Sequence, residues 1–256
     1  MFRQDPIIIT GVGHSGTRGL VQVLTASSDI YFGDISNPKR EWEFYRVLAA
    51  KVNGRLLGIP ERHNHNIIAP DIYQHFQPTA QQITDSVAYI RSEIEQNVAL
   101  SMPPNEEIVW VIKTPRTMLC LDIWYQVFPQ ATFINLVRDG RDVAFSLPED
   151  CGTLERRFEL WRKRLHRIWR YRQAGIPVYD FRYEDLVDAE KTRQFLLQLG
   201  ITYQAEMADE LRLSQGKGIK AFEGRFVEHF ELFKYGYLPD VYSTSRLEKL
   251  KRLVSL

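Results

Sequence analysis

Hydrophobic residues along the chain follow two patterns, short apolar runs and longer stretches with helical spacing. The apolar runs predict buried strands, which we place at Ile7–Thr10, Ile108–Ile112, Thr132–Val137 and Val178–Phe181, and a short strand or extended segment at Ile30–Asp34. The helical spacing predicts helices that begin near Gly19 or span Gln81–Leu100, Leu119–Phe128, Thr153–Ala174, Lys191–Leu199 and Arg246–Leu253. Because strands and helices alternate, we expect an α/β fold of three layers, in which helices flank a central, mainly parallel sheet.

Two segments interrupt this pattern. The segments Arg62–Pro78 and Ser214–Gly224 have weak periodicity and predict loops, of which the first is expected to lie over the site.

The helix Thr153–Ala174 carries one apolar stripe, and its other positions are rich in Arg and Lys. We interpret these cations as a solvated basic face rather than as a patch for an acidic substrate.

Composition bounds the class of protein. A chain of 256 residues with 44% hydrophobic residues can bury a substantial core, and we expect one domain over residues 1–256. The net charge of +1 gives no global electrostatic reason to bind nucleic acid or an anionic membrane. Cys120 and Cys151 are too few for a disulfide framework and are expected to be unpaired thiols.

The first strand follows Met1 within a few residues, and no apolar run approaches the length needed to span a membrane. We therefore expect a cytoplasmic protein without a signal peptide or an integral membrane segment.

The first strand leads into a glycine-rich loop with the sequence Gly11-Val12-Gly13-His14-Ser15-Gly16-Thr17-Arg18. Glycines allow a tight turn that brings successive N–H groups toward one point, and the start of the following helix adds partial positive charge. The loop therefore predicts a binding site for a phosphate-like anion.

This loop differs from that of nucleotide triphosphatases, which need Gly, four residues and then Gly-Lys-Ser/Thr. Gly11 and Gly16 have the required spacing, but Thr17 and Arg18 follow them. The apolar run Ile108–Ile112 ends in Lys113 instead of a magnesium-binding aspartate. A kinase that uses ATP and magnesium is therefore a disfavoured alternative, and we expect no metal.

A second motif begins where the strand Thr132–Val137 ends. Here Arg138 is followed by Ser146 in the first turns of the next helix, so that a guanidinium and a hydroxyl can hold one phosphate together. Ligands of parallel sheets bind at the carboxyl ends of the strands, where Gly11–Arg18, Lys113 and Arg138 are all expected to lie.

These motifs together resemble those of sulfotransferases that use 3′-phosphoadenylyl sulfate (PAPS). The loop residues Gly13, His14, Ser15, Gly16, Thr17 and Arg18 are similar to the family's 5′-phosphosulfate loop, and Arg138-Asp139-Gly140-Arg141 with Ser146 resembles its 3′-phosphate motif, as in the tyrosylprotein enzymes. Weaker matches are Lys113-Thr114-Pro115, Tyr183-Glu184-Asp185 and Lys217-Gly218. The resemblance implies a P-loop-like fold, a sulfuryl-binding Lys113, an adenine contact from Tyr183, and closure over the 3′-phosphate by Lys217 and Gly218.

The resemblance also implies in-line transfer of a sulfuryl group from PAPS to a hydroxyl, leaving 3′,5′-adenosine bisphosphate. His14 stands where relatives commonly have Lys or Arg to stabilise the bridging oxygen. Either His14 is protonated beside the phosphosulfate, or Lys113 and Arg18 provide more of the positive charge. Asp34 falls where the heparan-type enzymes have a catalytic glutamate, and Glu41, His63 and His65 are the other candidate bases.

The acceptor is expected to be a small molecule, a lipid or a sugar. Aromatic residues of the segment Asn37–Pro78 and of the region after Gly224 either line its binding wall or belong to the core. The replacement of the family's cation by His14 leaves a second alternative open, a nucleotide-binding module with a degenerate site.

Overall fold

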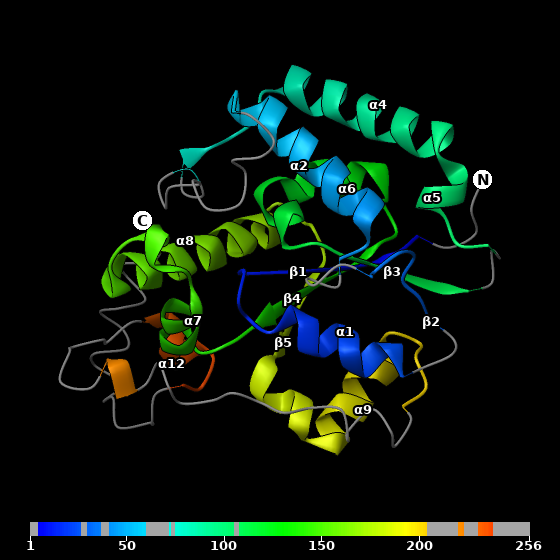
Figure 1. The fold of residues 1–256 in the computed structure, drawn as a ribbon. Coiled ribbons are helices and arrows are strands. Elements are labelled where there is room, and N and C mark those ends of the chain that lie inside the picture. The colour runs from blue at the N-terminus through cyan, green and yellow to red at the C-terminus, as the bar shows by residue number, and fades with distance from the viewer. Residues whose placement is uncertain are drawn as a thin grey trace.

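A five-stranded parallel sheet forms the centre of the molecule (Figure 1). The computed structural model describes residues 5–26, 30–36, 41–59, 72, 75–104, 108–203, 220–222 and 230–237. The strands are β1 (Ile7–Gly11), β2 (Ile30–Tyr31), β3 (Val109–Lys113), β4 (Thr132–Val137) and β5 (Val178–Arg182), and they lie side by side in the order β2-β3-β1-β4-β5. Every pairing between neighbours is parallel. The predicted strands are confirmed, and in the segment Ile30–Asp34 the strand β2 covers only Ile30 and Tyr31.

Helices cover both faces of this sheet. In chain order, the helical elements described are α1 (Thr17–Thr25), α2 (Glu43–Leu57), α4 (Ala80–Gln96), α5 (Val98–Ser101), η2 (Pro115–Cys120), α6 (Leu121–Val127), α7 (Gly140–Ser146), η3 (Glu149–Cys151), α8 (Leu154–Gln173), η4 (Tyr183–Val187), α9 (Ala189–Gln198) and α12 (Phe230–Lys234). Figure 1 shows α1 and α9 on one side of the sheet and α2, α4, α6 and α8 on the other. The predicted three-layer α/β fold is confirmed.

Alternation along β1 divides the core between these two layers. Ile8 packs into the larger hydrophobic cluster with residues of α2, α6 and α8, whereas Ile7 and Ile9 pack with Leu20 and Leu24 of α1. Because successive side chains of a strand point to opposite faces, one buried apolar strand joins both halves of the core.

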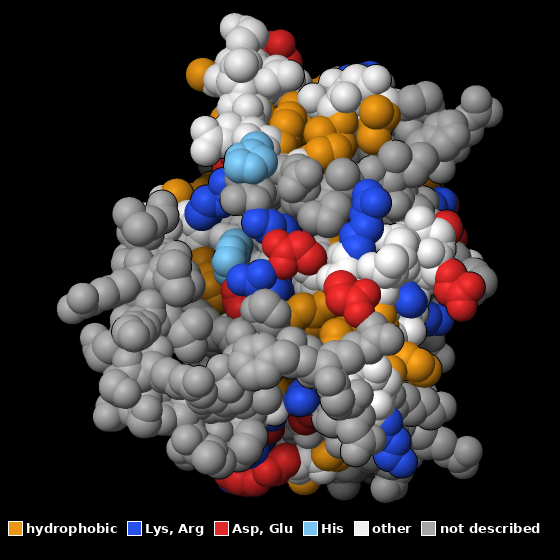
Figure 2. Space-filling view, turned by 90° about the vertical axis from the view of Figure 1, so that its left-hand side faces the viewer, with side chains coloured by type: hydrophobic (Ala, Val, Ile, Leu, Met, Phe, Trp, Pro, Cys, Tyr) orange, Lys and Arg blue, Asp and Glu red, His pale blue; other side chains and the backbone are white. Residues whose placement is uncertain are grey.

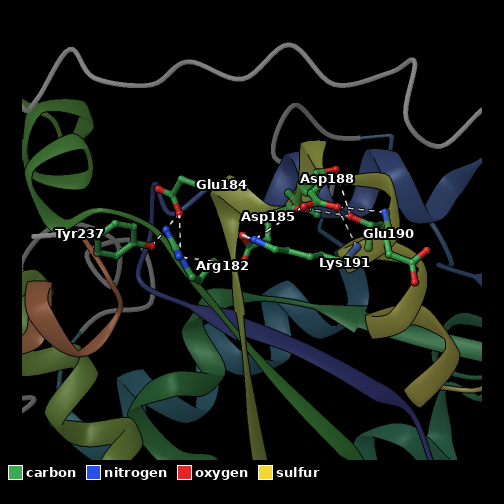
Figure 3. Close-up of polar contacts among 9 residues, drawn as sticks. Arg182, Glu184, Asp185, Asp188, Glu190, Lys191 and Tyr237 are labelled. Atoms are coloured by element: carbon green, nitrogen blue, oxygen red, sulfur yellow. Dashed lines mark hydrogen bonds and ion pairs between the residues drawn. The ribbon is translucent and has the colours of Figure 1, made fainter. Parts of the chain in front are cut away.

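Local chemistry explains where the helices begin. Thr79 and Gln82 form a reciprocal capping box at the start of α4, and Thr153 accepts a hydrogen bond from Arg156 N at the start of α8. Asp188 caps α9 by accepting from the backbone N–H groups of Glu190 and Lys191, in a cluster that Figure 3 shows beside β5.

Two sequence expectations differ from the structure in detail. The stretch predicted as one helix over Gln81–Leu100 is divided between α4 and α5 at Asn97, whose extended φ of −127° interrupts the helix. The helix α2 was not predicted, because its N-terminal residues Trp42 and Tyr45 are held by distant partners. Trp42 packs edge-on against Trp110 of β3, and Tyr45 donates a hydrogen bond to the carbonyl of Ser101.

The predicted solvated basic face of α8 is wrong for two of its arginines, because Arg164 and Arg167 are buried. Arg167 donates to the carbonyl of Leu119 at 2.7 Å and to the hydroxyl of Tyr171 at 2.9 Å. The helix therefore uses its cations to satisfy backbone oxygens and to contact neighbouring elements.

Other expectations have simpler outcomes. Cys120 and Cys151 are both unpaired thiols, as predicted. No helix within the described residues is long and apolar enough to cross a membrane. The predicted loop Ser214–Gly224 and helix Arg246–Leu253 lie mostly or wholly outside the described residues, as does most of Arg62–Pro78.

The short helix α12 is attached to α8 through a buried carboxylate. Glu231 accepts hydrogen bonds from Arg162 at 3.1 Å and from the ring of His166 at 2.5 Å. Burial alone would raise the pKa of Glu231, but the hydrogen bonds from His166 and Arg162 outweigh it and lower this pKa to about 2.

This lowered pKa predicts how stability depends on pH. Because the folded-state pKa lies below the ordinary value of 4.5, Glu231 stabilises the fold above pH 4.5 and loses this contribution as the pH falls toward 2. We expect Glu231→Gln to reduce the free energy of unfolding at pH 7 by on the order of 3 kcal/mol, and the difference from wild type to shrink below pH 4.5. Urea unfolding at several pH values measures this difference.

Glu95→Gln is the matched control, since it removes the same charge from an exposed position of α4. We expect it to change the free energy of unfolding by no more than about 0.5 kcal/mol. A Glu231→Gln effect that stayed constant down to pH 2 would contradict the assignment.

Candidate active site

The predicted site residues lie near the carboxyl ends of the strands. The strand β1 is followed by α1 on one face of the sheet, and its neighbour β4 is followed by α7 and α8 toward the other face. Such a divergence between adjacent parallel strands opens the crevice in which α/β folds bind ligands. Figure 2 shows Lys and Arg side chains gathered near the centre of one face of the molecule, beside histidine and among carboxylates.

The glycine loop after β1 folds back on itself. Three of its residues have positive φ, namely Gly11 at 138°, His14 at 71° and Gly16 at 91°. The amide of Ser15 donates to the carbonyl of Val12 at 2.9 Å, which closes the turn. A Cβ on Gly11 would lie 2.9 Å from the carbonyl oxygen of Leu136, so glycine allows the loop to rest directly on β4.

The start of α1 fits an anion. Gly16 is the N-cap residue and provides no side-chain hydrogen bond, in contrast to the capped helices α4, α7, α8 and α9. The hydroxyl of Ser15 is buried without a hydrogen-bond partner in the described part of the chain. Uncapped N–H groups, a buried hydroxyl and the positive end of the helix dipole are the groups that bind phosphate.

The second motif forms another cationic turn at the end of β4. Asp139 caps α7 by accepting from the amide of Arg141 at 2.9 Å and also pairs with the Arg141 side chain. Arg138 is buried, and its guanidinium lies 3.6 Å from a carboxylate oxygen of Asp142. This pair holds Arg138 in place while leaving it beside the loop.

The structure brings the two motifs into contact. The His14 ring nitrogen Nδ1 lies 3.1 Å from the hydroxyl of Ser146, and Arg138 donates to the His14 carbonyl at 3.4 Å. Tyr183 joins them, because its ring lies beneath the Arg138 guanidinium at 4.8 Å and against Gly16. Residues from three strand ends therefore meet at one place.

Glu184 connects this junction to Tyr237. It accepts from the backbone amide of Asp139 at 3.2 Å and from the hydroxyl of Tyr237 at 2.8 Å. Figure 3 shows Glu184, Arg182 and Tyr237 close together. The Arg182 guanidinium covers the ring of Tyr237, and Arg141 donates to the Tyr237 carbonyl at 3.0 Å. These contacts attach the segment after α12 to the Arg138 turn.

Sequence reasoning did not find Glu184 or Tyr237. Glu184 was recognised only as part of a motif, and Tyr237 has no local pattern that distinguishes it from other tyrosines. Their roles depend on contacts between residues 53 positions apart, which a reading of local periodicity does not include.

Lys113 at the end of β3 lies in a buried polar cluster. Its ammonium is 3.8 Å from Glu41, which also accepts from Arg116 at 2.9 Å and from the hydroxyl of Thr114 at 3.3 Å. Glu41 is only 4% exposed, so its carboxylate is committed to these donors.

Asp34 occupies a different environment. It is exposed after β2, and its carboxylate accepts from the amide of Ser36 at 3.0 Å, which lowers its pKa. Its backbone carbonyl accepts from the amide of Glu43 at 2.9 Å and so connects it to the start of α2.

The remaining predicted residues differ in their exposure, and four of them lie outside the described residues. Arg18 is exposed in the first turn of α1, whereas Thr17 is buried there. Lys217, Gly218, His63 and His65 lie outside the described residues.

Comparison with known proteins adds an independent finding. Residues 6–205 match the model of a family described as the sulfotransferase family. No curated protein sequence matches the chain significantly.

The solved structures that the chain matches include three bacterial sulfotransferases. The protein from Alicyclobacillus acidocaldarius is 15% identical with a TM-score of 0.48, and the alignment covers 98% of this chain and 96% of that one. The protein from Mycobacterium tuberculosis has 14% identity, a TM-score of 0.46 and coverage of 81% and 70%. The protein from Mycobacterium avium has 14% identity, a TM-score of 0.46 and coverage of 99% and 77%. The family assignment therefore depends on the sequence match.

The packing of Gly16 on Tyr183 generates a stability test. A Cβ on Gly16 would overlap the Tyr183 ring, and the φ of 91° adds backbone strain. Gly175 has a similar φ of 86° but open space around it, so Gly175→Ala measures the backbone strain alone. We expect Gly175→Ala to cost about 1–2 kcal/mol and Gly16→Ala to cost about 1–3 kcal/mol more in urea unfolding.

In a Tyr183→Ala background, Gly16→Ala should cost little more than Gly175→Ala, because the overlapping ring is absent, whereas Tyr183→Ala alone lowers stability as a core truncation. Equal effects of Gly16→Ala and Gly175→Ala would show that the loop is not packed on Tyr183.

Proposed function

The chain belongs to the sulfotransferase family, and on this basis we propose that it transfers a sulfuryl group from PAPS to a hydroxyl of a small-molecule, lipid or carbohydrate acceptor. The observation that carries the proposal is the contact between the glycine loop and the Arg138 turn, through His14 and Ser146. Two adjacent anion-binding motifs suit a ligand that has an anionic group at each end. PAPS carries a phosphosulfate at one end and a 3′-phosphate at the other.

We assign the residues around the donor by their position. The N–H groups of the glycine loop and of α1 would hold the 5′-phosphosulfate together with Ser15, Thr17 and Arg18. Arg138 and Ser146 would hold the 3′-phosphate, and Tyr183 would contact adenine. The uncapped start of α1 and the buried Ser15 hydroxyl support this arrangement.

Sulfuryl transfer needs cations around the moving group and depends mainly on positioning and electrostatic stabilisation. Lys113 at the end of β3 is the candidate cation, and Glu41 fixes its ammonium from the side at 3.8 Å. Glu41 therefore serves to orient Lys113 in this proposal. We assign the base that takes the acceptor proton to Asp34, whose side chain is exposed to solvent.

A kinase is not favoured. The loop lacks the lysine that reaches the β- and γ-phosphates of ATP, and the family match is to sulfotransferases. The aromatic wall expected for the acceptor does not include Trp42 and Tyr45, because both are buried in the core.

Binding of 3′,5′-adenosine bisphosphate tests the nucleotide site. We expect wild type to bind it without metal and more tightly than ATP with magnesium, as measured by calorimetry. Arg138→Ala should weaken binding by about 1.5–3 kcal/mol, because it removes a charge-assisted contact.

Arg193→Ala is the control, since it removes the same charge from an exposed arginine of α9 that pairs with Glu190. We expect its affinity to match that of wild type. An Arg138→Ala variant with unchanged affinity would count against the 3′-phosphate assignment.

Turnover tests the base. With an acceptor found by screening against a labelled sulfate donor, we expect Asp34→Asn to lose turnover and keep its affinity for the bisphosphate. Glu41→Gln should instead reduce stability, because it leaves Arg116 and Lys113 buried beside a neutral group.

Full activity of Asp34→Asn would move the base elsewhere. In that case His63 and His65 remain to be tested in the same assay.

A further inference from the structure

One face of α8 contacts both anion-binding motifs. Arg157 donates to the carbonyl of Leu147 at 2.6 Å, just after α7 ends. Trp161 covers Gly140 at the start of α7 so closely that a Cβ there would overlap the indole. Arg157, Trp161 and Arg164 follow one another at i, i+4 and i+7, which places all three on the same side of the helix.

Arg164 is the residue of this helix face that lies beside the glycine loop. Its guanidinium nitrogen lies 3.5 Å from the position that a Cβ on Gly13 would occupy. Arg164 is only 8% exposed, so its cation is held in a poorly solvated place beside the loop. Charge in such surroundings interacts strongly with a nearby anion, because little water screens it.

The loop's own basic position is directed elsewhere. The His14 ring lies within hydrogen-bond distance of Ser146, on the side of the Arg138 turn. Arg164 is the buried cation that the geometry places at Gly13, on the side of the glycine loop. Its planar fork of donors suits the oxygens of a phosphate or sulfate group.

We propose that Arg164 binds the 5′-phosphate end of the nucleotide and supplies the guanidinium that the loop lacks at His14. This inference rests on the proposed function. In it, α8 provides a cation to the loop and also fixes the distance between the loop and α7 through Arg157 and Trp161.

The test compares two ligands that differ only at the 5′ end. Adenosine 3′,5′-bisphosphate and adenosine 3′-monophosphate share the nucleoside and the 3′-phosphate. We expect Arg164→Met to weaken binding of the bisphosphate about tenfold to a hundredfold and to change binding of the monophosphate by less than about threefold. Arg164→Lys should show an intermediate loss, because it keeps the charge without the fork.

Lys163→Met is the matched control. It removes one positive charge from the adjacent residue of α8, whose ammonium pairs with Glu159 at 3.3 Å. We expect both ligands to bind this variant as they bind wild type. Thermal unfolding of all three variants shows whether each is folded. If Arg164→Met does not fold, the two ligands are compared on Arg164→Lys instead.

The outcomes separate this inference from the proposed function. If wild type prefers the bisphosphate and the Arg164 variants keep that preference in full, the role of Arg164 is refuted and the proposed function stands. An equal loss for both ligands would also refute it, because it indicates support of the fold alone. If wild type binds the bisphosphate no more tightly than the monophosphate, the nucleotide site itself fails.

Discussion

The structure depends on one junction, where the loop after β1 rests on the turn after β4. The parallel pairing of β1 with β4 sets it, since Gly11 lies opposite Leu136 at the end of the two strands. Any side chain at position 11 would collide with the Leu136 carbonyl. The loop can therefore pack against β4 only because residue 11 is glycine. The His14 and Ser146 contact follows from this close approach.

Two polar clusters lie beside the strand ends, one partly buried around Glu184 and one buried around Glu41. Glu184 accepts hydrogen bonds from the amide of Asp139 and the hydroxyl of Tyr237. Glu41 pairs with Lys113 and Arg116 beside β3, the neighbour of β1 opposite β4. Removing one member of the Glu41 cluster leaves an unpaired buried charge, which costs more than the pair contributes. The supporting residues are therefore sensitive positions although they need not touch a ligand.

Local sequence patterns were sufficient for the sheet and for placing the glycine loop and the Arg138 turn at the ends of neighbouring strands. Apolar runs identified the strands, and Gly11–Arg18 and Arg138–Ser146 were recognisable because each motif is contiguous. The helix α2 was missed because tertiary packing of Trp42 and Tyr45 positions its start. Arg164 could not be distinguished from the other arginines of α8, since only the approach of Gly13 singles it out.

The central claim is that the glycine loop and the Arg138 turn hold opposite ends of one nucleotide. A crystal structure of the protein with 3′,5′-adenosine bisphosphate tests it most directly. The account predicts the 3′-phosphate on Arg138 and Ser146 and the 5′-phosphate on the N–H groups that begin α1. A nucleotide with both phosphates on one motif, or bound away from both, would contradict it.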